Sequence, residues 1–305
     1  MRHLYAAVFE PGFFASPQVH IAVAVGGVVA IVSAVTGVFT VMRGQSFGGH
    51  ALGDVSGAGG SAALLIGLSP VAGFVGLGIA GAAVMDMIGV RRLRGRDLAT
   101  GIVLGSAIGL SALFLYLTTT SGATSGAPQQ ILFGSIFTIS SGTIPAVAVL
   151  GAIALASIAT VCRPLLLSTV SPDIAAARGV PVRLVGLLYM LALAVSVGLS
   201  SLAIGAILST ALLIGPAAAA LRLTSRVAWA VGIACLIGVL AIGLGVLLAY
   251  DSYDWGSSHL GLPVSFFIVA VIFVTYLASG LPAAVRARAR NGEAAAAPER
   301  VKISA

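Results

Sequence analysis

A histidine and an aspartate stand four residues apart, as His50 and Asp54, in a glycine-rich and otherwise mostly apolar stretch. If that stretch is a helix, a separation of four places both side chains on one face. Imidazole and carboxylate together suit borderline divalent metals such as zinc, manganese and iron. Two ligands fall short of a complete metal cage, but a site of transit has to release its cargo. The pair predicts either a metal path or a His–Asp hydrogen bond that only holds helices together.

Other ionisable residues in or near apolar stretches have simpler explanations. Asp86 stands five residues before Arg91, so pairing with the nearby arginines is favoured over a place on a path. Asp251, Asp254 and His259 share a short polar segment. We expect this segment to be solvated, although such a segment can also receive a partner or a cation.

The composition of the 305-residue chain is that of a membrane protein. Hydrophobic residues make up 59% of it and charged residues only 8%, whereas a soluble domain carries about 25% charged residues. This excludes a soluble enzyme, a nucleic-acid-binding domain and a disordered protein.

Fifteen of the 16 basic residues are arginines, and the one lysine is Lys302. A Walker A loop needs a lysine beside its glycines, so any ATP hydrolysis belongs to another chain.

Nine stretches are candidates for membrane-spanning helices, each with about the 20 apolar residues that a bilayer requires. The expected fold is therefore all-α, a polytopic membrane helical bundle. The sixth and seventh stretches adjoin, so a very tight turn or a broken helix must separate them. The nine predicted spans are 18–42, 50–68, 70–90, 98–118, 142–162, 183–202, 203–221, 227–249 and 263–281.

The basic residues predict the orientation of these spans. The segments 119–141 and 250–262 contain no lysine or arginine. Nearly all basic residues follow odd-numbered spans, which places those ends in the cytoplasm by the positive-inside rule. The N-terminus is then outside and the C-terminus is cytoplasmic. The basic residues after odd-numbered spans are Arg43, Arg91, Arg92, Arg94, Arg96, Arg163, Arg178, Arg183, Arg222, Arg226, Arg286, Arg288, Arg290, Arg300 and Lys302.

The chain divides into three parts on this basis. Residues 1–17 form an interfacial N-terminal segment with no visible cleaved signal peptide, residues 18–281 form the transmembrane domain, and residues 282–305 form a polar, disordered cytoplasmic tail. Small residues recur every fourth position from Gly53 to Ser61 and from Gly101 to Gly109. Both runs predict close packing of helices.

A short capped helix is predicted between the fifth and sixth spans. Ser171 is a suitable N-cap, Pro172 suits the first helical position, and Gly179 follows the end. A helix of one or two turns is not stable alone. The segment therefore predicts either a surface that docks on a cytoplasmic partner or a simple connecting turn.

Three stretches resemble the permease subunits of bacterial ABC importers for zinc, manganese and iron. The first stretch follows the first span and contains both His50 and Asp54. The resemblance extends over about residues 18–281 and is most specific in the third stretch. The three stretches are Arg43-Gly-Gln-Ser-Phe-Gly-Gly-His50-Ala-Leu-Gly-Asp54-Val-Ser, Gln130-Ile-Leu-Phe-Gly134-Ser-Ile, and Ser171-Pro-Asp173-Ile-Ala-Ala-Ala-Arg178-Gly179-Val-Pro181, the last continuing through 203–209 and 211–220.

The resemblance implies a multi-pass protein of the bacterial cytoplasmic membrane that works as a homodimeric pore. It implies two cytoplasmic ATP-binding subunits and an extracytoplasmic metal-binding lipoprotein as partners. The metal is then cargo, ATP lies on the partner subunit, and this chain binds no cofactor of its own. The implied coupling helix, which contacts the ATPase, includes Ser171, Pro172, Asp173, Arg178, Gly179 and Pro181.

The same resemblance implies that polar residues of the second span lie on the metal path. In the family motif an aspartate usually occupies the position of His50 and a histidine that of Asp54, so the two are exchanged here. One imidazole and one carboxylate still share a helix face. The exchange moves each ligand by about one helical turn, ~5.4 Å, which leaves the identity of the metal open.

The predicted function is that of the permease of an ATP-driven importer of divalent metals, a transport subunit rather than an enzyme. One alternative is an ABC permease for iron-siderophore or cobalamin uptake, which would not need a His–Asp pair inside the membrane. A second is an ion-coupled secondary transporter, but the inverted repeats and multiple membrane carboxylates typical of that class are not found. An intramembrane enzyme would need more catalytic groups than His50 and Asp54 supply.

Overall fold

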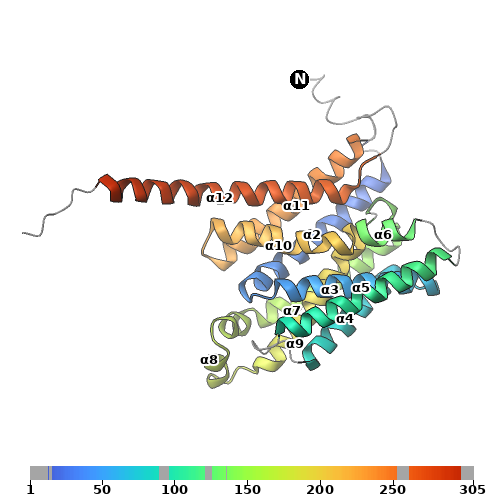
Figure 1. Ribbon diagram of the computed structural model, residues 1–305, viewed down its shortest axis with the longest axis horizontal. Helices are drawn as coiled ribbons and strands as arrows, with labels where there is room; N and C mark the ends of the chain where they lie inside the picture. The colour runs from blue at the N-terminus through green and yellow to red at the C-terminus, as the bar shows by residue number, and fades with distance from the viewer. Residues whose placement is uncertain are drawn as a thin grey trace, which may run out of the picture.

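Helices form all the regular structure in the part of the chain that the computed structural model describes, residues 13, 16–88, 96–120, 126–134, 136–252 and 261–296 (Figure 1). Each of the nine predicted spans coincides with one long helix. These helices are α2 (Pro17–Met42), α3 (Ser46–Ile66), α4 (Pro70–Ile88), α5 (Arg96–Thr120), α7 (Ile144–Val170), α9 (Val182–Ile204), α10 (Ala206–Leu223), α11 (Val227–Asp251) and α12 (Val264–Ala296).

Seven helices of the described ranges are long and apolar enough to cross a membrane, namely α2, α4, α5, α7, α9, α10 and α11. The helical membrane fold is thereby confirmed. The apolar part of α12, Val264–Gly280, is shorter. Helix α3 is less apolar because it is rich in glycine and carries His50 and Asp54. The count of nine spans and the orientation of the termini stay predictions.

The centre of the bundle is formed by α2, α3 and α9. Helix α9 is buried along most of its length, and it packs against α4, α7, α3 and α2. Helix α3 packs against α5, α4, α9 and α10, so most of its surface faces protein. The least apolar of the long central helices is thus surrounded by other helices.

The two glycine runs differ in what lies opposite them. Added Cβ atoms at Gly53 and Gly57 would lie 2.9 Å from Ser209 Oγ and 2.6 Å from Ala206 Cβ, so this run packs closely on α10 as predicted. Gly101, Gly105 and Gly109 have no atom of the described chain within 4 Å of such a Cβ. The predicted close packing of this second run within the chain is wrong, because α5 lies at the outside of the bundle and covers α3 with its other face.

A single residue, Gly205, separates α9 from α10, which confirms the predicted tight break. Its φ of 92° and ψ of 155° lie in a region that only glycine adopts readily. Gly134, which ends the short helix α6 (Ala127–Phe133), has a φ of 75° and lies directly against Gly205. The backbones meet without side chains between them, so the second and third of the three sequence stretches are neighbours in space.

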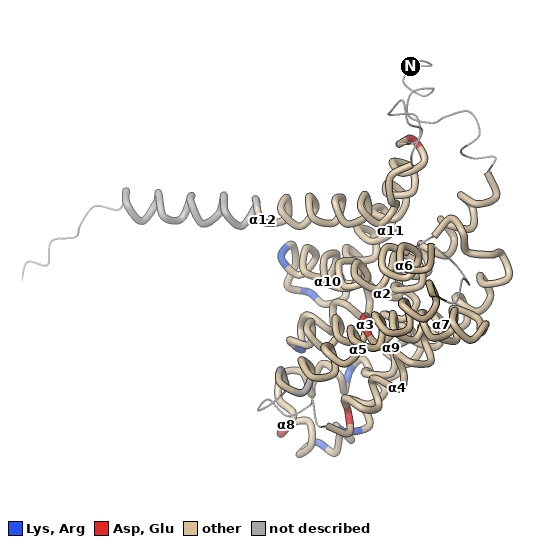
Figure 2. The backbone as a smooth tube through the Cα atoms, turned by 45° about the vertical axis from the view of Figure 1, so that its right-hand side comes forward, with Lys and Arg blue, Asp and Glu red and all other residues tan. Residues whose placement is uncertain are grey.

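The described basic residues lie toward one end of the bundle, together with α8 (Pro172–Ala177) (Figure 2). We call this the arginine-bearing end. Helix α12 continues to Ala296 and so includes the first part of the segment 282–305 that was expected to be disordered. Residues 1–12, the arginines at 91, 92 and 94, and Asp254 and His259 lie outside the described residues.

Candidate functional site

His50 and Asp54 lie on one face of α3, as their spacing predicts. The distance from His50 Nε2 to Asp54 Oδ2 is 3.8 Å, which is longer than a hydrogen bond. The His50 side chain is 39% exposed and the Asp54 side chain 13% exposed. Since both belong to the same helix, a contact between them does not join two helices. We call these two residues and their shared surface the His50–Asp54 face.

The other ring nitrogen of His50 joins α3 to α10. His50 Nδ1 and Thr210 Oγ1 are hydrogen-bonded at 2.9 Å. This bond fixes the direction of the imidazole ring and leaves Nε2 on the side of Asp54. A hydrogen bond of this kind at the second nitrogen is the usual way in which a metal-binding histidine is oriented.

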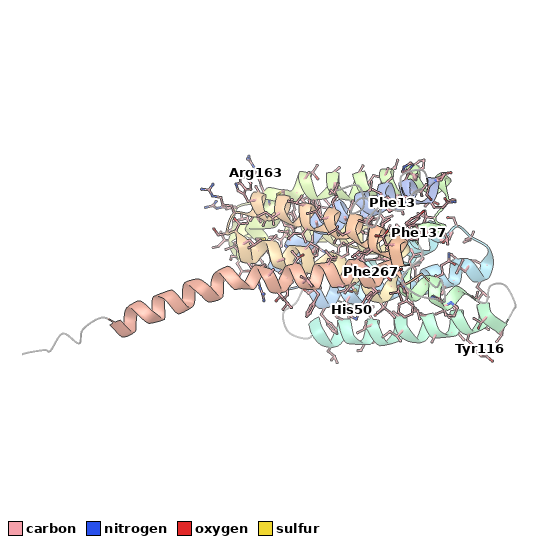
Figure 3. All side chains as sticks on the ribbon, turned by 90° about the horizontal axis from the view of Figure 1, so that it is seen from above. Phe13, His50, Tyr116, Phe137, Arg163 and Phe267 are labelled. Carbon is pink, nitrogen blue, oxygen red and sulfur yellow. The ribbon has the colours of Figure 1, made fainter. Side chains whose placement is uncertain are left out.

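Helices α10 and α5 flank the His50–Asp54 face. On the α10 side, α3 approaches closely through Gly49, where an added Cβ would lie 2.8 Å from Leu213 Cδ2. On the α5 side, Ser111 Oγ lies 3.5 Å from the Asp54 carbonyl oxygen. In Figure 3, His50 lies at the side of the bundle between α5 and α12. The face is thus open to one side of the chain and fixed by helices on the others.

The described residues contain no group of three or more His, Cys, Asp or Glu side chains placed to hold a metal ion. One chain therefore offers two candidate ligands at the His50–Asp54 face, as the sequence indicates. Sequence analysis did not find Thr210, which bonds to the His50 ring, or Ser111, which bonds to the Asp54 backbone. Neither residue type nor spacing reveals a contact between distant helices.

The predicted short helix is α8, at the arginine-bearing end. Ser171 Oγ accepts a hydrogen bond from the Ile174 backbone N–H at 3.3 Å, and Pro172 occupies the first turn with Asp173. Gly179 follows the C-cap Arg178 with a φ of 77°. Ala175 is buried, whereas the Ile174 side chain is 53% exposed. The helix packs on α7 and α9 and presents its other side outward (Figure 1).

Comparison with known proteins identifies the family. The model of the ABC 3 transport family matches residues 16–281. The manganese transport system membrane protein MntC of Halalkalibacterium halodurans is 30% identical over 247 residues, 80% of this chain and 83% of that protein. The high-affinity zinc uptake system membrane protein ZnuB of Haemophilus influenzae is 26% identical over 229 residues, 74% of this chain and 87% of that protein.

A solved structure has the same fold. It is described as PsaBC from Streptococcus pneumoniae in complex with Fab, and one of its chains aligns with a TM-score of 0.76 over 92% of this chain and 95% of that chain, at 24% identity. This chain therefore belongs to the ABC 3 transport family, as a multi-pass membrane permease subunit for which a separate subunit hydrolyses ATP.

Proposed function

We propose that this chain is the permease of an importer for divalent transition-metal ions, manganese, zinc or iron. The observation that carries the proposal is the His50–Asp54 face, with an imidazole and a carboxylate 3.8 Å apart on one helix. The relatives named above for manganese and zinc transport support the same class of cargo. His50 and Asp54 act as ligands along the path, and the metal is cargo that passes them.

The distance between the two ligand atoms suits one metal ion. Metal–nitrogen and metal–oxygen bonds of about 2.1 Å allow two ligands of the same ion to lie at most about 4.2 Å apart. The observed 3.8 Å falls within this limit. In the expected homodimer, two copies of the chain facing each other across a pore would bring four ligands together. A partner lipoprotein would deliver the ion from outside.

The class of cargo is tested by the metal content of cells. We expect cells that lack the gene to accumulate less of one divalent metal when that metal is scarce in the medium. The wild-type gene should restore the content, measured by elemental analysis of washed cells. Unchanged manganese, zinc and iron in the deletion strain would contradict the proposal, and iron restored only as a chelate would favour a siderophore permease.

Helix α8 is proposed to bind the cytoplasmic ATPase, with Ser171, Pro172, Asp173, Arg178, Gly179 and Pro181 forming and flanking it. Its exposed side chain Ile174 supports this, because a short helix with an apolar residue facing outward gains from a partner groove. The neighbouring carboxylate of Asp173 and guanidinium of Arg178 are exposed as well.

Replacing Ile174 with aspartate is expected to reduce co-purification of the ATPase by about tenfold or more, the effect of losing a central interface anchor. The measurement is the ratio of ATPase to permease after affinity purification in detergent. Leu223→Asp is the matched control, because Leu223 is 47% exposed and lies at the end of α10 rather than on α8. An undiminished ratio in Ile174→Asp would show that α8 is a connecting turn.

A further inference from the structure

A row of buried hydroxyl groups joins α2 to α9. Three pairs of fully buried hydroxyl groups follow one another along both helices, and the two oxygens of each pair lie 2.6–2.8 Å apart. We call this row the hydroxyl seam. Its three pairs are Ser33 with Ser200, Thr36 with Ser196, and Thr40 with Tyr189. Hydrogen bonds between helices surrounded by apolar residues hold the two helices together, so α2 and α9 form one unit.

Arg43 continues this seam at the arginine-bearing end. Its Nη1 donates to Ser168 Oγ and to Thr169 Oγ1, both at 3.2 Å, in the last turn of α7. The guanidinium carbon also lies 5.1 Å from the centroid of the Tyr189 ring on α9, within the range of a cation–π interaction. The side chain of Arg43, the C-cap of α2, therefore contacts both α7 and α9.

These contacts include both helices that flank α8. Helix α7 leads into α8, since Ser168 and Thr169 stand only a few residues before the N-cap Ser171. Helix α9 follows α8, and Tyr189 lies in its second turn. The Arg43 guanidinium therefore contacts both the helix that precedes α8 and the helix that follows it.

The backbone beyond Arg43 passes directly into the helix of the proposed metal ligands. Three residues form the whole link between α2 and α3, namely Arg43, Gly44 with a φ of 60°, and Gln45. The Gln45 N–H bonds to the Thr40 carbonyl at 2.9 Å and the Gly44 N–H to the Val41 carbonyl at 3.0 Å, the pattern of a Schellman motif. The link is short and hydrogen-bonded, so α3 must follow a movement of the end of α2.

We propose that Arg43 is a positioning residue that transmits the movement of α8 to the His50–Asp54 face. His50 lies seven residues beyond Arg43 along the chain, in the second turn of α3. The path runs from α8 through the end of α7 and the Tyr189 ring to Arg43, and then through the link into α3. It rests on the proposed function, in which α8 binds the ATPase and α3 carries metal ligands.

The test measures uptake and ATP hydrolysis together. The permease–ATPase complex is reconstituted in liposomes, and Mn²⁺ or Zn²⁺ uptake and phosphate release are followed in the same vesicles with the metal-loaded binding protein outside. We expect Arg43→Ala to assemble and hydrolyse ATP while the metal moved per ATP falls about tenfold, within the usual range of coupling between sites. Arg43→Lys should recover only part of the loss, because lysine lacks the planar guanidinium that stacks on a ring and presents several N–H donors at once.

Arg222→Ala is the matched control. The Arg222 guanidinium also stacks on a tyrosine, with its carbon 3.8 Å from the Tyr276 ring centroid, but it joins α10 to α12. Its removal should leave the metal moved per ATP unchanged. An equal loss in Arg222→Ala would show a general effect of removing an arginine and overturn the proposal.

A second variant removes the contact without removing the arginine. Ser168→Ala combined with Thr169→Val deletes both acceptors on α7 and leaves Arg43 over Tyr189, so a loss of coupling in the same direction is expected.

If uptake per ATP stays within about twofold of wild type in this variant and in Arg43→Ala, the proposal is wrong. Uptake and hydrolysis that fall together with the amount of complex would show a merely structural role. Wild-type vesicles that take up none of Mn²⁺, Zn²⁺ and Fe²⁺ would instead overturn the proposed function.

Discussion

Replacing His50 and Asp54 together with alanine is expected to reduce metal uptake to the level of cells without the chain. The substitution removes both ligands of the His50–Asp54 face, whereas the close approach of α3 to α10 depends on Gly49, Gly53 and Gly57. The chain should therefore still insert and assemble with the ATPase. Radiolabelled or elemental metal uptake, normalised to the permease in the membrane, is the measurement.

Two further variants separate a ligand from a residue that only holds helices. His50→Asn keeps an amide that can bond to Thr210 but supplies a poor metal ligand, so uptake should fall nearly as far as with alanine. Thr210→Val keeps the imidazole and removes only its orienting bond, for which a loss of about 10–100-fold in metal affinity is expected. Full uptake by His50→Asn would assign His50 to helix packing instead.

Replacing Gly205 with alanine is expected to remove most folded permease from the membrane. A φ of 92° with a ψ of 155° costs a residue with a side chain about 1–3 kcal/mol. The added Cβ would also meet the Leu132 carbonyl oxygen and the backbone of Gly134. Backbone atoms cannot rotate away as a side chain does, so the contact between α6 and the break separating α9 from α10 must open.

Thermal unfolding in detergent, followed by fluorescence-detected gel filtration, measures this effect. Gly243→Ala on α11 is the control, because an added Cβ there meets nothing within 4 Å and alanine favours a helix by about 0.5–1 kcal/mol over glycine. A melting temperature of Gly205→Ala equal to that of wild type would refute the importance of this break.

Much of the fold could be predicted from the sequence because hydropathy alone locates a helix that faces lipid. The nine stretches coincide with nine long helices, and the adjoining sixth and seventh spans predicted a break, which the structure places at Gly205. Helix α6 within 119–141 was not predicted, since seven residues carry too little periodic signal. Spacing also placed His50 and Asp54 on one face, because four residues make about one helical turn.

What lies opposite a residue could not be predicted. The runs from Gly53 and from Gly101 have the same spacing, yet one packs on α10 and the other faces outward. Spacing shows that one face of a helix carries only small residues. Which helix packs against that face depends on how distant segments of the chain come together. Thr210 beside His50, and Ser168 and Thr169 beside Arg43, are contacts of this kind.

The low hydropathy of α3 has a consequence for the biogenesis of the protein. An aspartate at the centre of a helix costs about 2.5–3.5 kcal/mol on leaving the translocon for lipid, and Asp54 lies near the centre of α3. If α3 is a span, as predicted, the helices that cover it are α4, α5, α9 and α10, and all four are synthesised after it. The helix that carries the proposed metal ligands therefore lacks its packing partners until later segments have been synthesised. A ribosome stalled before α4 would leave this helix uncovered and accessible to membrane quality-control proteases.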